Sequence, residues 1–435
     1  MHKGVKISNM REDFLHYLWK YKKFHWQKAQ AVDGKNLVLI DTGKHNQNQS
    51  GPDFFNAKVK IGEQLWAGNV EIHLRSSDWY FHQHETDPAY DNVILHVVWE
   101  NDVEVYRKNN SPIPTLELKK LTEKNTLDNY QKLLENPSKK WINCENVFSG
   151  FDDFTVDNWL ERIFLERLAE KSEKVLNLLE KSNNDWESVL FRMMTKNFGL
   201  NVNGEAFLSI AESIPFSVVR KMAHNREQLE ALFFGQAGLL SGNIQEPYFQ
   251  KLSKEYAYQK NKFKLENKNV LPVKYFRLRP DNFPNIRLAQ LAGLYASHKQ
   301  LFSKIIRAKT IKSLRNIFQT DVSDFWQSHY TFEKESRKRA KKLTSGFVDL
   351  LIINTVVPLI FCYERFTGSL DPEKIFALMR KIESEKNSIV SKFESLRKKT
   401  AQNALDSQAL LQLKKYYCEQ NRCLHCGLGI KLLKN

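Results

Sequence analysis

Two stretches of alternating residues around a short turn constrain the fold of this chain more than any other feature. Between residues 55 and 61, Phe, Ala, Val and Ile alternate with polar residues, and a second alternating stretch covers residues 66–74. Gly62 and Glu63 lie between the two stretches. Period-two patterns on both sides of a tight turn predict a β-hairpin with one buried face.

Elements on both sides of the hairpin complete an α/β unit. Residues 11–24 have helical spacing, and residues 37–40 form a short apolar run. A short helix is expected over residues 76–84, and the continuous apolar run 92–99 is typical of a central strand buried on both faces. This order predicts an N-terminal α/β domain over residues 1–120, with a mixed sheet and flanking helices.

The remainder of the chain is predicted to be helical. Apolar residues recur there at three- and four-residue spacing, which is typical of helices packed through one face. We expect a large all-α region over residues 121–409, followed by a cysteine-rich segment over residues 410–435. The clearest helical patterns cover residues 156–180, 186–198, 228–235, 286–298, 348–366 and 372–397.

Charge is distributed unevenly along the chain. Residues 1–120 carry 16 Lys and Arg against 15 Asp and Glu, whereas the whole chain carries 66 against 50. A basic excess of this kind attracts polyanions, so DNA or RNA is a candidate partner; the alternative is a Lys-rich protein without such a partner. The basic run 336–342 is expected on a helix, and its candidate phosphate contacts are Arg337, Lys338, Arg339, Lys341 and Lys342.

The sequence predicts a cytoplasmic protein that does not interact with a membrane. The first residues lack the apolar segment of a signal peptide. The most apolar run, residues 350–363, is too short to span a bilayer and contains Asn354 and Pro358, which favours a buried helix. Five cysteines, three of them near the end, do not suggest a secreted disulfide framework.

Acidic residues on the hairpin indicate a possible hydrolytic site. Metal-dependent hydrolysis of a phosphodiester needs carboxylates that bind a divalent cation, and Asp53 and Glu71 can supply them. Glu71 and His73 are two residues apart on a strand and therefore face the same side. Strict alternation would place Asp53 opposite Ile72, on the other side from Glu71. The site therefore requires a bend or bulge near residues 52–55.

Pro52-Asp53, followed at strand distance by Glu71-x-His73, resembles the motif of the PD-(D/E)XK, or restriction-endonuclease-like, nucleases. The order of elements predicted above is similar to the core of that superfamily. The resemblance implies that Asp53 and Glu71 bind Mg²⁺, and that Glu12 matches an acidic residue that some members carry on the first helix.

This sequence departs from the nuclease motif at His73, where a lysine is usual. His73 is then a metal ligand or lies near the attacking water, and Arg75 is a candidate for the missing positive charge. A catalytically inactive nucleic-acid-binding protein on the same fold is the alternative. Most of the chain also resembles a bacterial family known as a domain of unknown function, through the stretches G-P-D-F, N-V-E-I-H, S-S-D-W and N-V-I-L-H-V-V.

Histidines near the hairpin allow a different metal site. His82 and His84, together with Asp87 and Asp91, could bind a transition metal and act on a small phosphorylated substrate. The alternative is that both imidazoles are exposed on a short helix. His96, in the apolar central run, is interpreted as a structural core residue.

Three cysteines close the chain with the spacing Cys418-x4-Cys423-x2-Cys426. In a cytoplasmic protein this spacing favours a metal over a disulfide, with structural zinc first and an iron–sulfur cluster second. Some nucleases of the superfamily named above hold their ends with such a cluster. The fourth ligand is Cys144 or Cys362, and the alternative is three reduced thiols without a metal.

Overall fold

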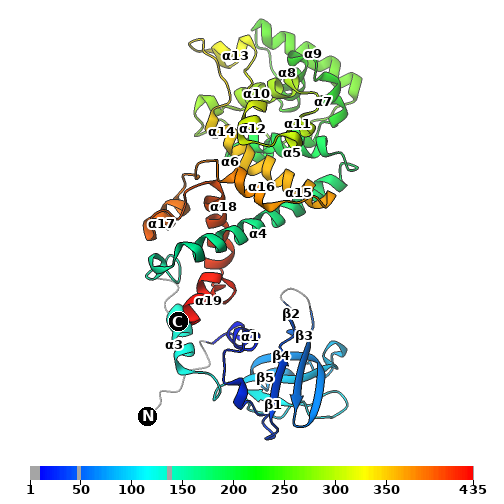
Figure 1. The fold of residues 1–435 in the computed structure, drawn as a ribbon. Helices are drawn as coiled ribbons and strands as arrows, with labels where there is room; N and C mark the ends of the chain where they lie inside the picture. Colours follow the sequence, from blue (N-terminus) through cyan, green and yellow to red (C-terminus); the bar gives the residue numbers. More distant parts are fainter. Residues whose placement is uncertain (1–9, 47–49, 135–139, 435) are drawn as a thin grey trace. The chain divides into compact units, whose positions relative to one another are not determined.

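A six-stranded mixed sheet organises the N-terminal part of the computed structural model, which describes residues 10–46, 50–134 and 140–434 (Figure 1). The strand order is β1-β3-β4-β5-β6, with β2 paired to β3. β3 is antiparallel to β1 and β4, whereas β4, β5 and β6 run parallel. The strands are β1 Leu37–Asp41, β2 Lys44–His45, β3 Phe54–Ile61, β4 Gln64–Arg75, β5 Val93–Glu100 and β6 Thr115–Glu117.

The predicted hairpin is β3 and β4, and the predicted central strand is β5. Every residue of β5 except Glu100 is buried, as expected for a strand covered on both faces. α1 (Glu12–Lys20) lies against β4 and buries Phe14 and Trp19 in the same apolar cluster as Trp99 of β5. Two further helices, α2 (Asp78–Phe81) and α3 (Lys124–Leu134), complete the α/β unit that the sequence predicts.

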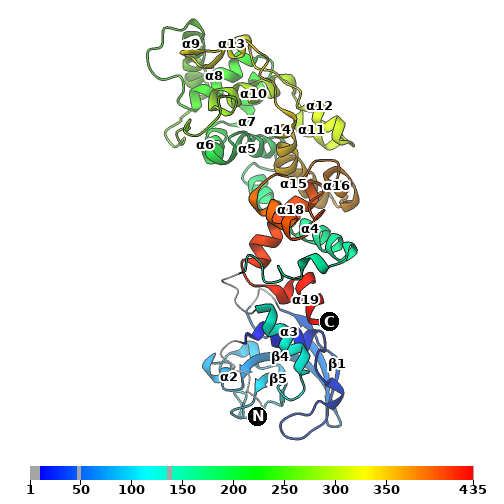
Figure 2. The same ribbon diagram turned by 90° about the vertical axis from the view of Figure 1, so that its left-hand side faces the viewer.

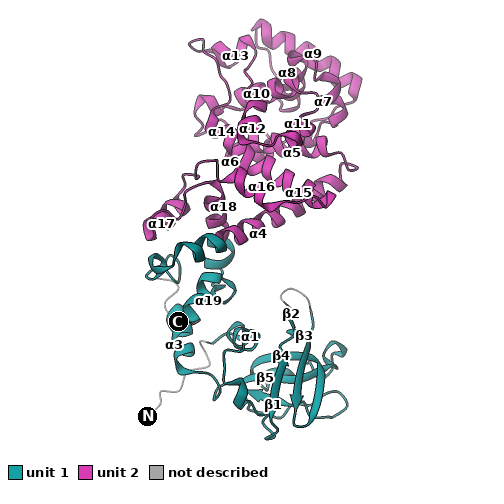
Figure 3. Cartoon of the chain, in the orientation of Figure 1, with its two compact units in different colours: residues 1–159, 413–435 teal, residues 160–412 magenta. Residues whose placement is uncertain are grey.

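The chain divides into two compact units (Figure 3). The first contains residues 1–159 and 413–435, and the second contains residues 160–412. The cysteine-rich C-terminal segment is therefore part of the α/β unit. Its helix α19 (Gly427–Lys434) packs near α3 (Figure 2), and Leu424 and Leu433 join the apolar cluster that contains Phe14.

The second unit is built mainly from helices, as the three- and four-residue spacing of its apolar residues predicts. The chain enters it through α4 (Asp153–Glu180) and leaves it through α18 (Ala404–Leu413). The helices between them are α5 Trp186–Phe198, α6 Leu200–Glu212, α7 Phe216–Met222, α8 Arg226–Gln236, α9 Pro247–Phe263, α10 Pro284–Ser297, α11 Leu301–Arg307, α12 Ile311–Ile317, α13 Asp324–Ser328, α14 Ser345–Leu351, α15 Val357–Thr367, α16 Pro372–Met379 and α17 Ser388–Leu396.

Two stretches of the second unit differ from the sequence-based expectation. The segment predicted as one helix over 372–397 is divided into α16 and α17. The basic run 336–342 is not helical: it follows the small hairpin of β7 (His329–Thr331) and β8 (Lys334–Glu335) as an irregular segment. Backbone N–H groups of Ser336 and Arg339 donate to the carbonyls of Ser328 and Gln327, so pairing with this neighbouring chain replaces helical hydrogen bonds.

The most apolar helix of the described residues covers 345–367, where a π-helical segment, Ile352–Val356, joins α14 to α15. By length and composition it is long enough to cross a membrane, so it exceeds the shorter run predicted from sequence. However, 72% of its most apolar window is buried inside the protein, in agreement with the predicted buried helix.

Candidate metal and hydrolytic site

A bulge in β3 brings the two predicted carboxylates to the same side of the sheet. Ala57 pairs with Gly68, but Phe54 pairs with Val70, so two residues of β3 oppose one residue of β4. Asn56, with φ of 57°, occupies the left-handed region that such an extra residue can require, and asparagine tolerates it better than most residues. The expected bend therefore lies slightly after residues 52–55.

Hydrogen bonds hold Asp53 and Glu71 beside each other. The backbone N–H of Asp53 donates to Glu71 Oε2 at 3.1 Å, and the N–H of Ile72 donates to Asp53 Oδ2 at 3.0 Å. Each carboxylate thus accepts a bond from the other strand's backbone, which fixes both side chains. Glu71 is 5% exposed, whereas Asp53 is partly accessible.

Helix α1 adds an acidic and a basic group to the site. Glu12 and His16 are four residues apart and therefore share one face of α1. His16 Nε2 lies 3.3 Å from Asp53 Oδ2. Burial and the charge of Asp53 raise the pKa of Glu12, which indicates that this carboxyl group lies in the field of the site. The structure thus brings Glu12 together with Asp53 and Glu71.

Four histidines form a chain of contacts beside Glu71. His73 Nε2 and His84 Nε2 lie 3.5 and 3.4 Å from Glu71 Oε1. The Nε2 of His73 is also 3.1 Å from His82 Nδ1, and its Nδ1 is 2.8 Å from His96 Nε2. One potential ligand atom from each of His73, His82 and His84 lies within 4.8 Å of the other two.

The histidine site differs in part from its sequence-based description. His82 is exposed, as the alternative interpretation expected, but His84 is only 10% exposed at its side chain and lies after the end of α2. The third member of the group is His73 rather than Asp87, whose carboxylate instead caps a short helix at Ala89. His96 is buried and bonded to His73, and its Nδ1 has no hydrogen-bond partner among the described residues.

Burial determines the protonation of the groups around Glu71. Burial, reinforced by the nearby charge of Asp53, raises the pKa of Glu71 to about 9. Burial also lowers the pKa of His73 far below its usual value and that of His84 to about 4. In the metal-free site Glu71 is therefore a neutral acid, and His73 and His84 are neutral imidazoles, at neutral pH. A cation would stabilise the ionised form of Glu71 while the imidazoles remain neutral, as metal ligands require.

His16, on α1, differs from His73 and His84 because its pKa is raised rather than lowered. Burial alone would lower the pKa of its imidazole, but the carboxylates of Asp53, Glu12 and Asp13 outweigh that effect. The neighbouring carboxylates therefore favour the charged imidazolium form of His16 next to Asp53. Sequence reasoning overlooked this residue, although its four-residue spacing from Glu12 on the predicted first helix was a usable signal.

The raised pKa of Glu71 predicts that the stability of the metal-free protein depends on pH. The unfolded chain releases the Glu71 proton near pH 4.5, whereas the folded chain retains it until about pH 9. The folded state thus keeps a proton on Glu71 that the unfolded state has lost, and the contribution of Glu71 to stability should fall as pH rises through this interval. The imidazoles with lowered pKa oppose this effect around pH 6.5, where the unfolded forms are about half protonated, and only weakly between about pH 7.5 and 8.5, where the unfolded forms are largely neutral.

Chemical denaturation at several pH values, with and without Mn²⁺, measures this dependence. The free energy of unfolding is compared between the unaltered chain and Glu71→Gln, so that the contributions of other groups cancel. In the metal-free protein this difference in free energy should change with pH. Added Mn²⁺ should reduce the change because the cation competes with the proton. A pH-independent difference would show that Glu71 is ionised in the folded protein.

The predicted phosphate contacts lie in different environments. Arg75 follows Glu71 and His73 on the same side of β4 and is exposed. Arg337, Lys338 and Lys342 are also exposed. Two members of the basic run interact with other groups of the protein. Arg339 forms an ion pair with Asp281. Lys341 is 4% exposed, and its ammonium group donates to the carbonyl of His329 at 2.6 Å.

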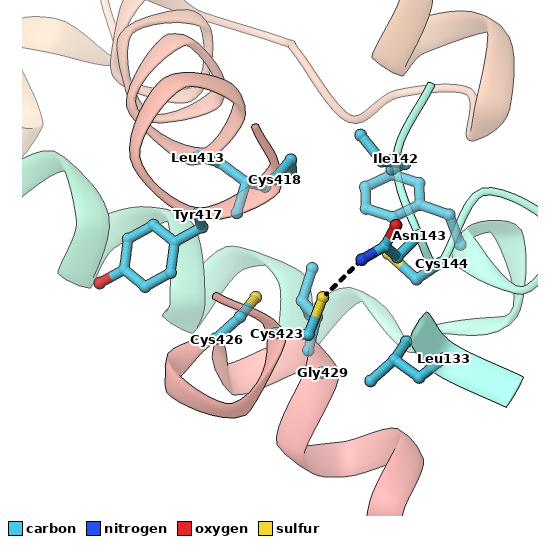
Figure 4. A pocket seen from close by; sticks show the side chains of 12 residues that line it. Leu133, Ile142, Asn143, Cys144, Leu413, Tyr417, Cys418, Cys423, Cys426 and Gly429 are labelled. Atoms are coloured by element: carbon cyan, nitrogen blue, oxygen red, sulfur yellow. Dashed lines mark hydrogen bonds between the residues drawn. The ribbon is translucent and has the colours of Figure 1, made fainter. Parts of the chain in front are cut away.

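The C-terminal cysteines meet a fourth cysteine in the first unit. Cys418, Cys423, Cys426 and Cys144 line one small cavity (Figure 4). Cys362, the other candidate, belongs to the second unit and is buried there with its sulfur 3.7 Å from the carbonyl of Ser172. Of the two alternatives left open by the sequence, the structure therefore places Cys144 beside the C-terminal group.

The fold and the site define a two-unit protein whose mixed-sheet unit carries grouped carboxylates and imidazoles. The chain belongs to the family described as "Protein of unknown function (DUF2851)", whose model matches residues 12–388. This confirms the predicted resemblance to a family of unknown function, whereas the resemblance to PD-(D/E)XK nucleases stays a prediction. The match includes the carboxylate and histidine residues and Cys144, and it ends before Cys418. No curated protein and no solved structure matches the chain.

Proposed function

We propose that this chain hydrolyses phosphodiester bonds in nucleic acid, with a divalent cation bound by Asp53 and Glu71. The observation that carries the proposal is the bulge of β3, since a regular strand would separate these carboxylates. The pairing of an acidic residue at the start of one strand with Glu71-x-His73 on the next is the arrangement implied by the resemblance to PD-(D/E)XK nucleases.

The residues of the site have distinct roles in this proposal. Asp53 and Glu71 bind the cation, and Glu12 adds negative charge from α1. A bound cation would polarise the phosphate and lower the pKa of an attacking water. His16 supplies the positive charge that a lysine usually provides in the motif, because its pKa is raised whereas that of His73 is lowered.

The neighbouring imidazoles bear on the choice of metal. Mg²⁺ prefers oxygen ligands, whereas imidazole nitrogen is a common ligand of Mn²⁺-, Fe²⁺- and Zn²⁺-type sites. His73 and His84 lie next to Glu71 Oε1. We therefore propose Mg²⁺ as one usable cation and expect Mn²⁺ to bind more tightly.

The exposed members of the basic run are the proposed phosphate contacts in the second unit. Changing Arg337, Lys338 and Lys342 together to Glu should weaken binding to DNA and RNA of any sequence, because such residues contact phosphates rather than bases. The slope of log K against log salt should become shallower by about two to three, since each phosphate contact contributes about 0.7–0.9. Fluorescence anisotropy at several salt concentrations measures this slope.

A control variant with the same change in net charge separates local contacts from the overall field. Lys58, Lys108 and Lys120 are exposed lysines of the nearly neutral first 120 residues, and changing all three to Glu provides this control. If the slope of log K against log salt becomes shallower by the same amount in both triple variants, binding depends on net charge. The assignment of phosphate contacts to residues 337–342 is then wrong.

A second candidate function rests on the compact group of His73, His82 and His84. This group, with Glu71, has the nitrogen and oxygen donors of a transition-metal enzyme acting on a small phosphorylated substrate. Such an enzyme would act equally well at high salt, because its substrate makes few ionic contacts, whereas nucleic-acid binding would weaken steeply.

Cleavage assays on the full chain test the proposed function. Labelled single- and double-stranded DNA and RNA are incubated with Mg²⁺ or Mn²⁺, with EDTA as the metal-free reference. Metal-dependent products support the nuclease. Salt-dependent binding without cleavage under any of these conditions would instead identify an inactive nucleic-acid-binding protein on the same fold.

A further inference from the structure

The four cysteines of the first unit come from distant parts of the sequence and surround a common space. Cys144 precedes α4, whereas Cys418, Cys423 and Cys426 lie near the end of the chain. They line a cavity of about 20 Å³ whose other lining residues are mainly apolar (Figure 4). A disulfide is absent among them, and all four are free thiols in the described structure.

A π-helical segment, a tight turn and backbone N–H groups surround the C-terminal cysteines. Cys418 is the last residue of a π-helical segment, Lys414–Cys418, a rare element that often occurs at functional sites. Cys423 and Cys426 close a tight turn, with the N–H of Cys426 donating to the carbonyl of Cys423 at 3.2 Å. The backbone N–H groups of Leu428 and Gly429 point at the sulfur of Cys426.

Two further contacts connect this turn to distant parts of the first unit. The side-chain N–H of Asn143 donates to Cys423 Sγ at 3.3 Å, and the same amide donates to Asn421 Oδ1 at 3.0 Å. Gly429 allows the close approach of α19, because a Cβ atom there would lie 2.1 Å from the carbonyl oxygen of Cys423. Donors directed at sulfur stabilise its thiolate form, which is the form that binds metal.

We infer that Cys144, Cys418, Cys423 and Cys426 form a metal centre of four thiolates that attaches the C-terminal segment to the α/β unit. Four sulfur ligands select soft metals, namely zinc or the iron of an iron–sulfur cluster. This centre is separate from the proposed cation site at Asp53 and Glu71, and it stands whether or not the chain cleaves nucleic acid.

The electrostatics of the thiols agree with this inference. Burial raises the pKa of all four, and the charge of neighbouring thiolates raises it further for Cys144, Cys418 and Cys426. Four buried thiolates therefore cannot coexist without a compensating cation. No three of the sulfurs lie within 4.8 Å of one another in the described residues, so a zinc ion with bonds of about 2.3 Å would draw them closer together.

The test measures metal and acid-labile sulfide in the full chain, purified anaerobically without chelators. A colourless protein with about one zinc per chain identifies zinc, and iron with sulfide and visible absorption identifies a cluster. Cys144→Ser should weaken the affinity for the metal at least about tenfold, measured as loss of metal on dialysis against a chelator, since even changes next to a metal ligand commonly lower the affinity by that factor. Cys362→Ser, which removes the buried thiol of the second unit, is the matched control and should retain full occupancy.

A measurement on the unaltered chain covers the case in which Cys144→Ser does not fold. Alkylation followed by mass spectrometry should show Cys144, Cys418, Cys423 and Cys426 protected together and reactive together once a strong chelator has removed the metal. The reactivity of Cys362 should not depend on that removal. A protein without stoichiometric metal, a Cys144→Ser variant with full occupancy, or a Cys144 that reacts independently of metal removal would overturn the inference.

Discussion

Changing Asp53 to Asn or Glu71 to Gln is expected to lower the rate of metal-dependent cleavage by at least about 10²–10³-fold, because each change removes a charged ligand of the cation that stabilises the transition state. Both substitutions keep an oxygen that can accept the existing backbone bond, from Ile72 to residue 53 and from Asp53 to residue 71. The fold should therefore be preserved while the charge is lost. Initial rates on a labelled oligonucleotide, at several concentrations of Mg²⁺ or Mn²⁺, measure the effect.

Binding of nucleic acid separates this effect from a loss of structure. Both variants should bind the oligonucleotide with nearly unchanged affinity in the absence of metal. Glu63→Gln is the matched control: its carboxylate is 99% exposed in the turn of the same hairpin, so cleavage should be unaffected. If either site variant cuts as fast as the parent protein, the assignment of the cation site to Asp53 and Glu71 is wrong.

The elements that depend on local pattern were predictable from the sequence. Alternation defined the hairpin of β3 and β4, and a continuous apolar run defined β5. α5 has the predicted bounds, because its helical spacing is uninterrupted and Asp185 caps its first turn. These features depend on residues close together in the chain, so a pattern of period two or 3.6 is sufficient to find them.

The geometry of the candidate site depended on features that such patterns do not contain. Alternation alone placed Asp53 on the wrong side, and the position of the extra residue, at Asn56, follows from pairing with β4. The group of His73, His82 and His84 forms because β4 and the turn after α2 meet in space. The basic run 336–342 does not form the predicted helix because its backbone is hydrogen-bonded to residues 327 and 328.

The cysteine site was predictable in part from local sequence and depends in part on tertiary packing. The spacing of Cys418, Cys423 and Cys426 is local and indicated a metal site from the sequence. The fourth member could not be chosen, because Cys144 lies more than 270 residues away and only the packing of the C-terminal segment on the first unit brings it near. That packing is apolar as well, since Leu424 and Leu433 join the cluster that contains Phe14.

Removal of the metal from the four-cysteine centre is expected to lower the Tm of the first unit by at least about 10 °C. Structural zinc contributes roughly 10 kcal/mol to the folding of small zinc-binding peptides. Even half of that corresponds to about 10–20 °C in a domain of 150–250 residues. Without metal, the three thiols of the C-terminal segment and the thiol of Cys144 become protonated and lose the metal ion that they share. Scanning calorimetry before and after treatment with a strong chelator measures the change.

The location of the effect distinguishes this centre from the cation site of the sheet. Metal removal should expose the C-terminal segment, so proteases should first cut within residues 413–434, while the second unit stays protected. Glu71→Gln should show the same decrease in Tm on chelation, because it retains the cysteine centre, whereas Cys144→Ser should begin at the lower Tm and respond little to the chelator. If chelation removes stoichiometric metal without changing the Tm or the cutting of residues 413–434, the centre does not hold the C-terminal segment in place. The apolar contacts of Leu424 and Leu433 would then be sufficient to do so.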